Sequence, residues 1–269
     1  MSQRLGARAV LGGSAVLLAA AFAMGAVSGA YAISLSQLWN VLTSLGQGAS
    51  GQSPEHLVFL NIRLPRLVLG VAAGAGLGMA GTLMQGLFRN PLADPGLIGI
   101  SSGAALAAGV TIVLGASFWP MLPRTLGSWT LVLMAFGGGF VVTLLIYGLS
   151  RSEGGTRMAL MLLAGIAINA LAGAGLGLLS VMATDEQLRS LQFWLLGSLG
   201  GARWSAVILV GVAVLLSCWA AASLASPLNA IALGEAQAAL LGVDVERTKQ
   251  RAVVITAVAV GAVTATTGI

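Results

Sequence analysis

Few side chains in this sequence could carry out chemistry, and those few are far apart. His56 is the only histidine and Cys218 the only cysteine, so neither a His/Cys metal site nor a Cys–His nucleophile can be assembled in the usual way. Catalysis inside a membrane would need paired acids, a Ser/Lys pair or a His/metal set within apolar segments. The acids Asp94 and Glu235 fall in polar connections instead. The sequence therefore predicts a protein with no catalytic site, metal or cofactor of its own.

One glycine motif resembles a cofactor site. Residues 76–81 match the dinucleotide-binding pattern G-x-G-x-x-G, which needs a strand before it and a helix N-terminus to hold phosphate. Here the motif lies in the middle of an apolar run, so we interpret it as helix packing. Gly70, Gly74 and Gly78, spaced by four, would form a smooth stripe for a neighbouring helix.

The elements that carry the polar residues are apolar helices. Hydrophobic residues make up 57% of the chain and charged residues 8%, against about 25% charged in a soluble domain. The mean hydropathy is +0.96. Apolar runs of about 20 residues recur, each long enough to cross a membrane as a helix, and their continuity favours helices over a barrel. The sequence predicts an all-α polytopic membrane protein with seven spans, at residues 9–33, 67–87, 98–114, 126–149, 160–182, 206–224 and 252–269.

The first of these runs has the basic start and the Ala-Tyr-Ala ending, residues 30–32, of a secretory signal. It is nearly twice as long as the apolar region of such a signal, so we expect a retained span.

The distribution of basic residues predicts the orientation. They occur singly between apolar runs, so the net charge of +5 does not indicate a nucleic-acid partner. If the N-terminus is cytoplasmic, eight basic residues lie inside and five outside, which agrees with the positive-inside rule. The inside set is Arg4, Arg8, Arg89, Arg151, Arg157, Arg247, Lys249 and Arg251, and the outside set is Arg63, Arg66, Arg124, Arg189 and Arg203.

Two polar connections stand out on the predicted cytoplasmic side. Residues 88–96 hold two prolines that stop a helix, and Asp94 with Ser101 and Ser102 could cap the next one; this is a rigid turn or a site with a further purpose. Residues 226–250 predict a short helix at 235–241, closed by Gly242, and a second helix capped by Asp244. Such a projection would receive a soluble partner, or it would merely join two spans.

The predicted outer side has two notable features. Arg63 and Arg66 flank a proline and would pair either with carboxylates of a docking protein or with lipid headgroups. Residues 188–204 are amphipathic at their start and glycine-rich at their end, which is typical of an interfacial helix lining a vestibule or of an ordinary aromatic belt. Between the first two spans, residues 34–55 form a polar loop in which we expect a short surface helix at 37–45.

These motifs, in this order, resemble the FecCD-type permeases of ABC importers for iron-siderophores, cobalamin and haem. The resemblance covers nearly all 269 residues. The amino-acid sequences of residues 87–95, 164–170 and 193–202 are most similar to those of the haem (hemin) permeases. The motifs that carry the resemblance are RLPR at 63–66, QGLFRNPLADPG at 85–96, GISSG at 99–103, LAGI at 163–166, FW at 193–194, GS at 197–198, LGE at 233–235 and LGV at 241–243.

The resemblance implies a cobalamin-permease-like helical bundle that works as a homodimer with two ATP-hydrolysing partner subunits and a periplasmic binding protein. It makes haem the transported substrate, with an iron-siderophore or cobalamin as the alternative, and it places the protein in the bacterial inner membrane. Arg63 and Arg66 become docking cations for the binding protein. The segment at 226–250 becomes the coupling helix for the ATPase, through Gly234, Glu235, Leu241, Gly242 and Val243. The cytoplasmic gate would include Thr156, Arg157, Met158 and Ala159.

The end of the sequence departs from the family pattern. Family members have about ten spans, and seven are expected here, with an apolar ending at Ile269. We therefore expect residues 1–269 to be a single permease domain that lacks its last spans. A channel or secondary transporter is the alternative outside this class, but it would leave the 226–250 segment without a partner.

Overall fold

A computed structural model describes residues 6–46, 53–152 and 155–269. Seven helical runs in these residues are long and apolar enough to cross a membrane, which confirms the predicted number of spans. Arg4, which was counted in the inside set, and residues 47–52 of the predicted polar loop lie outside the described residues. The seven runs are Ala7–Val27, Pro54–Phe88, Ile100–Phe118, Trp129–Leu149, Met158–Met182, Trp204–Ala222 and Val245–Thr267.

Short elements connect or extend these spans. The N-terminal part contains α1 (Ala7–Val27), α2 (Leu35–Gly46), α3 (Pro54–Val58), the π-helix η1 (Phe59–Arg63) and α4 (Leu64–Phe88). The middle part contains the 3-10 helix η2 (Pro95–Ile98), α5 (Ile100–Phe118), α6 (Leu122–Leu126), α7 (Trp129–Leu149), the strands β1 (Arg151–Ser152) and β2 (Gly155–Thr156), and α8 (Met158–Met182). The last part contains α9 (Asp185–Leu196), α10 (Trp204–Ala222), α11 (Ala225–Ala232), α12 (Glu235–Leu240) and α13 (Val245–Thr267).

The described chain divides into two compact units, which are treated separately below. Unit 1 comprises residues up to 71 together with 202–207, and unit 2 comprises 72–201 together with 208–269. The single permease domain expected from the sequence stays a prediction.

In unit 1, a π-helical turn makes room for a proline inside a long helical run. The sequence led us to expect Arg63 and Arg66 on the surface before a span starting at 67, but the helix begins at Pro54. Leu64 N–H bonds to Phe59 O across the π turn, directly before Pro65, which has no N–H to donate. The carbonyl of Leu60, whose π-type partner would be Pro65, accepts the indole N–H of Trp204 at 3.1 Å. The wider turn and the indole thus replace the hydrogen bond that the proline removes.

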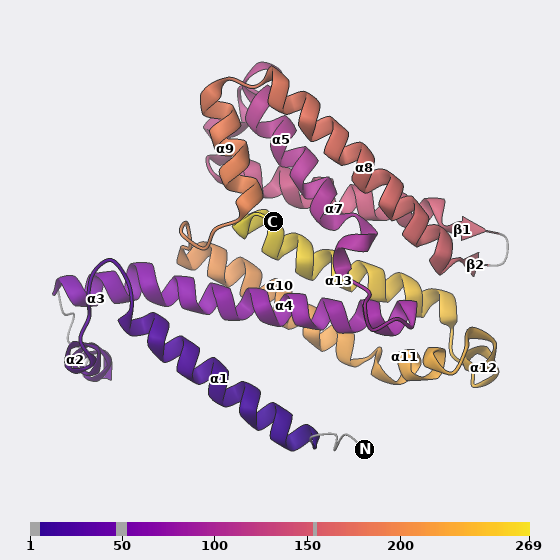
Figure 1. The fold of residues 1–269 in the computed structure, drawn as a ribbon, viewed down its shortest axis with the longest axis horizontal. Coiled ribbons are helices and arrows are strands. Elements are labelled where there is room, and N and C mark those ends of the chain that lie inside the picture. Colours follow the sequence, from indigo (N-terminus) through magenta and orange to yellow (C-terminus); the bar gives the residue numbers. More distant parts are fainter. Residues whose placement is uncertain (1–5, 47–52, 153–154) are drawn as a thin grey trace. The chain divides into compact units, whose positions relative to one another are not determined.

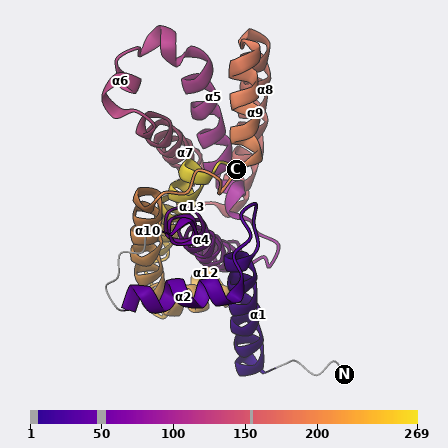
Figure 2. The same ribbon diagram turned by 90° about the vertical axis from the view of Figure 1, so that its left-hand side faces the viewer.

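Unit 2 is built around α5, which packs against α7, α8 and α13 (Figure 1). α6 joins α5 to α7 (Figure 2), and α9 packs against α5. A capping box of Thr184 and Gln187 starts α9, and it satisfies backbone N–H groups at the helix start. The core of the unit is apolar, and its fully buried large side chains include Met84, Leu87, Ile98, Ile100, Ile146 and Met161.

Glycines set the closest helix contacts of unit 2. A Cβ added to Gly138 of α7 would lie 2.2 Å from Ala107 Cβ and 2.7 Å from Gly103 O, both on α5. In α4 the close approach is at Gly76, where a Cβ would lie 2.8 Å from Val214 Cγ2, whereas at Gly74 and Gly78 it would meet no described atom within 4 Å. Two of the three glycines of the predicted stripe, Gly74 and Gly78, are therefore not where α4 meets its described neighbours. The interpretation of residues 76–81 as part of an apolar helix is confirmed.

The turn between α4 and α5 is fixed to α8. Asp94 accepts from Gly96 N–H at 2.7 Å and so caps η2, not α5 as we expected. No side chain caps α5; it starts at Gly99, whose φ is +79°. Ser102 instead donates to Asn169 Oδ1 of α8 at 2.6 Å. A Cβ on Gly165 would lie 2.0 Å from Leu97 O, so only glycine permits this contact.

The α5–α7 contact gives a first prediction. We expect Gly138→Val to lower the free energy of unfolding by about 1–3 kcal/mol, because the added side chain overlaps Ala107. The measurement is the midpoint of thermal unfolding of the detergent-solubilised protein. Gly137→Val is the matched control, since a Cβ there meets no described atom within 4 Å. Equal losses in both variants would contradict the packing argument.

Candidate coupling site

The short helix α12 is bounded by two glycines with positive φ. Gly234 has φ +128° and Gly242 has φ +83°, a backbone region that favours glycine. Val243 N–H bonds to Ala238 O and Gly242 N–H to Ala239 O, both at 3.0 Å, which is the Schellman ending of a helix. Asp244 then accepts from Arg247 N–H and caps α13. The helix, its terminal glycine and the second cap confirm the sequence interpretation of this segment, which did not foresee α11.

Three leucines in and beside α12 are exposed. Leu233, Leu240 and Leu241 are 71%, 89% and 68% exposed, although they belong to a connection between spans. Ala238 faces inward and is fully buried, and Val243 packs against the core of unit 2. Three neighbouring exposed leucines form a surface suited to a partner protein. We call Leu233, Leu240 and Leu241 the leucine surface.

The first residue of α12 is tied to α13 by an ion pair whose lysine is buried. Lys249 Nζ lies 2.7 Å from Glu235 Oε2, and the side chains are 3% and 42% exposed, respectively. The same nitrogen donates to Thr156 O at 2.7 Å. A buried ammonium is costly without partners, and these two oxygens supply them. Lys249 therefore connects the first residue of α12 to the end of β2.

A second carboxylate holds Thr156 from its other side. Glu246 accepts the N–H of Thr156 at 2.9 Å and the hydroxyl of Tyr147 at 2.7 Å. It also accepts the hydroxyl of Thr156. Glu246 and Lys249 are three residues apart on α13 and so lie on the same face. Together they bind the N–H, the side chain and the carbonyl of one residue.

The structure thus brings together two groups that the sequence had left separate. Lys249 binds both Thr156, which was predicted in the gate, and Glu235, which was predicted in the coupling segment. Arg157 is exposed and starts α8, Met158 packs against the core, and Ala159 is exposed. We call Tyr147, Thr156, Glu235, Glu246 and Lys249 the polar cluster.

The sequence analysis did not predict Lys249, Glu246, Tyr147 or Leu240 as site residues. Two features of the sequence could have pointed to Lys249 and Glu246. Lys249 is the only lysine in the chain, and its spacing of three from Glu246 places both on one helix face. Tyr147 gave no such signal, because its contact with Glu246 spans 99 positions of the sequence.

The two predicted docking arginines differ in their surroundings. Arg63 is 7% exposed, and its guanidinium donates to Ala26 O at 2.7 Å, to Val27 O at 2.8 Å and to Tyr31 O. It thereby satisfies carbonyls at the C-terminal end of α1. Arg66 is exposed. The docking roles of both arginines stay predictions. The burial of the Arg63 side chain does not favour its role.

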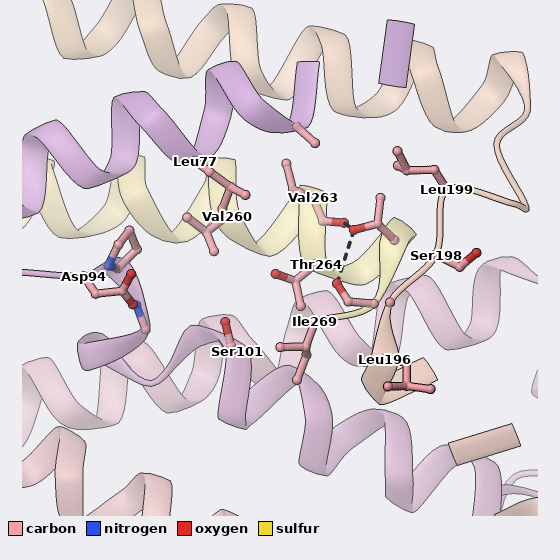
Figure 3. A pocket seen from close by; sticks show the side chains of 16 residues that line it. Leu77, Asp94, Ser101, Leu196, Ser198, Leu199, Val260, Val263, Thr264 and Ile269 are labelled. Atoms are coloured by element: carbon pink, nitrogen blue, oxygen red, sulfur yellow. Dashed lines mark hydrogen bonds between the residues drawn. The ribbon is translucent and has the colours of Figure 1, made fainter. Parts of the chain in front are cut away.

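An open cavity of about 490 Å³ lies elsewhere in unit 2. Figure 3 shows that its wall combines α4, the turn at 94–96, the residues after α9 and the end of α13. Ser198 N–H donates to Thr267 O at 2.6 Å, and a Cβ on Gly268 would lie 2.2 Å from Trp194 O. The wall is mainly apolar, and its polar side chains are Asp94, Ser101, Ser198, Thr264 and Thr267.

Comparison with known proteins assigns the family. The model of the FecCD transport family matches residues 17–269. The chain belongs to the FecCD transport family. This confirms the resemblance and the multi-pass helical membrane fold.

Individual FecCD relatives cover most of the chain. The chain is 42% identical over 269 residues to the hemin transport system permease protein HmuU of Yersinia pestis. The aligned region covers 100% of this chain and 77% of HmuU. The chain is 37% identical over 207 residues to the cobalamin import system permease protein BtuC of Halobacterium salinarum, covering 75% of this chain and 52% of that one. Thus it spans about half the length of the latter.

A solved structure supports the fold. An inward-facing conformation of a metal-chelate type ABC transporter matches with a TM-score of 0.80 and 26% identity, over 97% of this chain and 77% of that one. The FecCD fold of the described residues is therefore supported by both sequence and structure.

The polar cluster gives a second prediction. We expect Glu246→Gln to lower the free energy of unfolding by about 1–3 kcal/mol, because it removes the charge that accepts three hydrogen bonds. The midpoint of thermal unfolding in detergent measures this loss. Glu186→Gln makes the same change on an exposed side chain of α9, and it should leave the midpoint nearly unchanged. A similar midpoint for both variants would contradict a stabilising role of Glu246.

Proposed function

We propose that this chain is the transmembrane permease subunit of an ABC importer that carries haem across the bacterial inner membrane. The observation that carries the proposal is the leucine surface beside α12, an exposed apolar face in a connection between spans. A permease driven by a soluble ATPase needs such a face, and a channel does not. Membership of the FecCD family and the similarity to HmuU along the whole chain support the same function.

The proposal includes the partners and the orientation. If the N-terminus is cytoplasmic, α12 and the strands β1 and β2 would lie on the cytoplasmic side, and α9 and Arg66 would lie outside. The inside would then face two ATP-hydrolysing subunits, and the outside a periplasmic binding protein. Two copies of the permease would form the translocation path between them. The permease itself would perform no chemistry, since hydrolysis belongs to the ATPase.

Haem suits a path of this composition. It is flat, apolar on its faces and anionic at its propionates, so a mainly apolar wall with few polar groups would bind it weakly enough to release it. The cavity beside α13 has such a wall and is our candidate for part of the path. Cobalamin stays the alternative substrate, because a cobalamin permease is 37% identical, and an iron-siderophore is the other.

Reconstitution tests the proposal. The permease is placed in proteoliposomes with its ATPase and its binding protein, and ATP hydrolysis and uptake are measured with haem, cobalamin or a ferric siderophore. We expect haem to stimulate both. If only another ligand stimulated hydrolysis and uptake, that ligand and not haem would be the substrate. If none of the three stimulated them, the result would contradict an importer of this class.

The leucine surface gives a third prediction. We expect Leu240→Asp to reduce co-purification of the ATPase by about tenfold, because a charge would replace an apolar contact at the centre of the surface. The measurement is the ratio of ATPase to permease after affinity purification. Leu35→Asp is the control, since Leu35 is 75% exposed and would lie on the other side of the membrane. Normal ATPase recovery with Leu240→Asp would contradict the docking role of α12.

The arginine pair gives a fourth prediction. We expect Arg66→Glu to weaken binding of the periplasmic protein by about tenfold, because an exposed cation would become an anion opposite the carboxylates of that protein. Arg63→Glu should instead lower the thermal unfolding midpoint, because it would oppose three carbonyl oxygens. Binding is measured to the purified, folded variants. Unchanged binding with Arg66→Glu would refute the docking role of Arg66.

A further inference from the structure

We propose that Lys249 is a positioning residue that transmits the displacement of α12 to the gate. The inference rests on the proposed function, in which the ATPase moves α12. It assigns to one buried side chain the connection between the surface that would receive force and the segment that would open the path.

The first step of the argument is the position of the ammonium group. Lys249 Nζ bridges Glu235 Oε2 and Thr156 O, each at 2.7 Å. Glu235 is the first residue of α12, and Thr156 is the last residue of β2. Lys249 is 2% exposed and so is not part of the exposed leucine surface. It contacts both moving parts without occupying the face that would meet the ATPase.

The second step is the cost of breaking the bridge. If α12 moved and Lys249 did not follow, the buried ammonium would lose Glu235, the carboxylate to which it is hydrogen-bonded in the described part of the chain. Removing a partner from a buried charge is strongly unfavourable. The favourable response is a joint displacement of Glu235, Lys249 and the carbonyl that Lys249 holds. The bridge therefore acts as a stiff connection and not as a loose surface pair.

The third step is the attachment of Thr156 to α8. Thr156 is followed by Arg157, whose carbonyl accepts Met161 N–H in the first turn of α8. Arg157 N–H in turn bonds to Ser150 O at 3.0 Å, which fixes the base of the hairpin. Because Glu246 holds the N–H and hydroxyl of Thr156, this residue cannot shift independently of α13. A movement transmitted by Lys249 consequently reaches the N-terminus of α8, where the gate is predicted.

The experiment measures coupling, not activity alone. The complete complex with its ATPase and binding protein is reconstituted with wild-type permease, Lys249→Met or Lys249→Arg, and transport per ATP hydrolysed is determined. We expect Lys249→Met to retain the ATPase and to lower transport per ATP by about tenfold, the equilibrium effect of losing one hydrogen bond to a charged group. Lys249→Arg, which keeps the positive charge, should retain part of the wild-type transport per ATP.

A second variant removes the bridge from its other end. Glu235 is 42% exposed, so Glu235→Ala creates no buried cavity. Its thermal unfolding midpoint is measured as well, because the variant leaves the Lys249 ammonium without this carboxylate. Its transport per ATP should fall as in Lys249→Met, and the double variant should be no worse than either, since all three lose one connection. Gln237→Ala on the same helix is the matched control and should keep the wild-type ratio.

The possible outcomes separate the inference from the proposed function. If wild-type permease neither binds the ATPase nor transports, both fail. If the wild type transports and both Lys249→Met and Glu235→Ala keep its ratio, only the role of Lys249 is overturned. A parallel loss of hydrolysis, transport and thermal stability at a constant ratio would also overturn it, since that result is what a purely structural residue would give.

Discussion

The interior of a membrane offers no water to unpaired polar groups, and this constraint determines where the polar groups of this chain lie. At two places where a helix lacks a backbone hydrogen bond, a side chain supplies one. The indole of Trp204 donates to the Leu60 carbonyl before Pro65, and the guanidinium of Arg63 donates to the last carbonyls of α1. Lys249, near the N-terminal end of α13, likewise donates to the Thr156 carbonyl. Both buried cations, Arg63 and Lys249, thus bind backbone oxygens.

This pattern separates the charged residues by what they can do. Arg63 and Arg66 are three positions apart, yet one is buried against three carbonyls and the other is exposed. A buried cation that already has partners loses more than it gains by turning toward another protein. It is better suited to fixing the relative position of two segments. The exposed groups, Arg66 and the leucine surface, are the ones suited to recognition.

The sequence was sufficient for the features that depend on local patterns. Apolar length predicted the spans, and Gly242 and Asp244 predicted the end of α12 and the start of α13. It was insufficient where a contact joins distant segments, as with Tyr147 and Glu246, or where tertiary packing changes a local rule. Asp94 has the residue type of a helix cap but caps η2, and the close approach of this turn to Gly165 of α8 could not be read from the local pattern. Likewise, we expected the span to start at residue 67, after Pro65, yet the π turn before the proline lets one helix continue through it.

The length of α12 has a consequence for anyone who wishes to block this surface. Six residues are too few for a helix that is stable alone in water. Its order comes from the two flanking glycine turns, from burial of Ala238 and from the bond between Glu235 and Lys249. A linear peptide copying residues 233–243 would lack the last two and would have to fold as it bound, at a cost in conformational entropy. A peptide inhibitor of this contact would therefore need a covalent constraint that replaces the rest of the membrane domain.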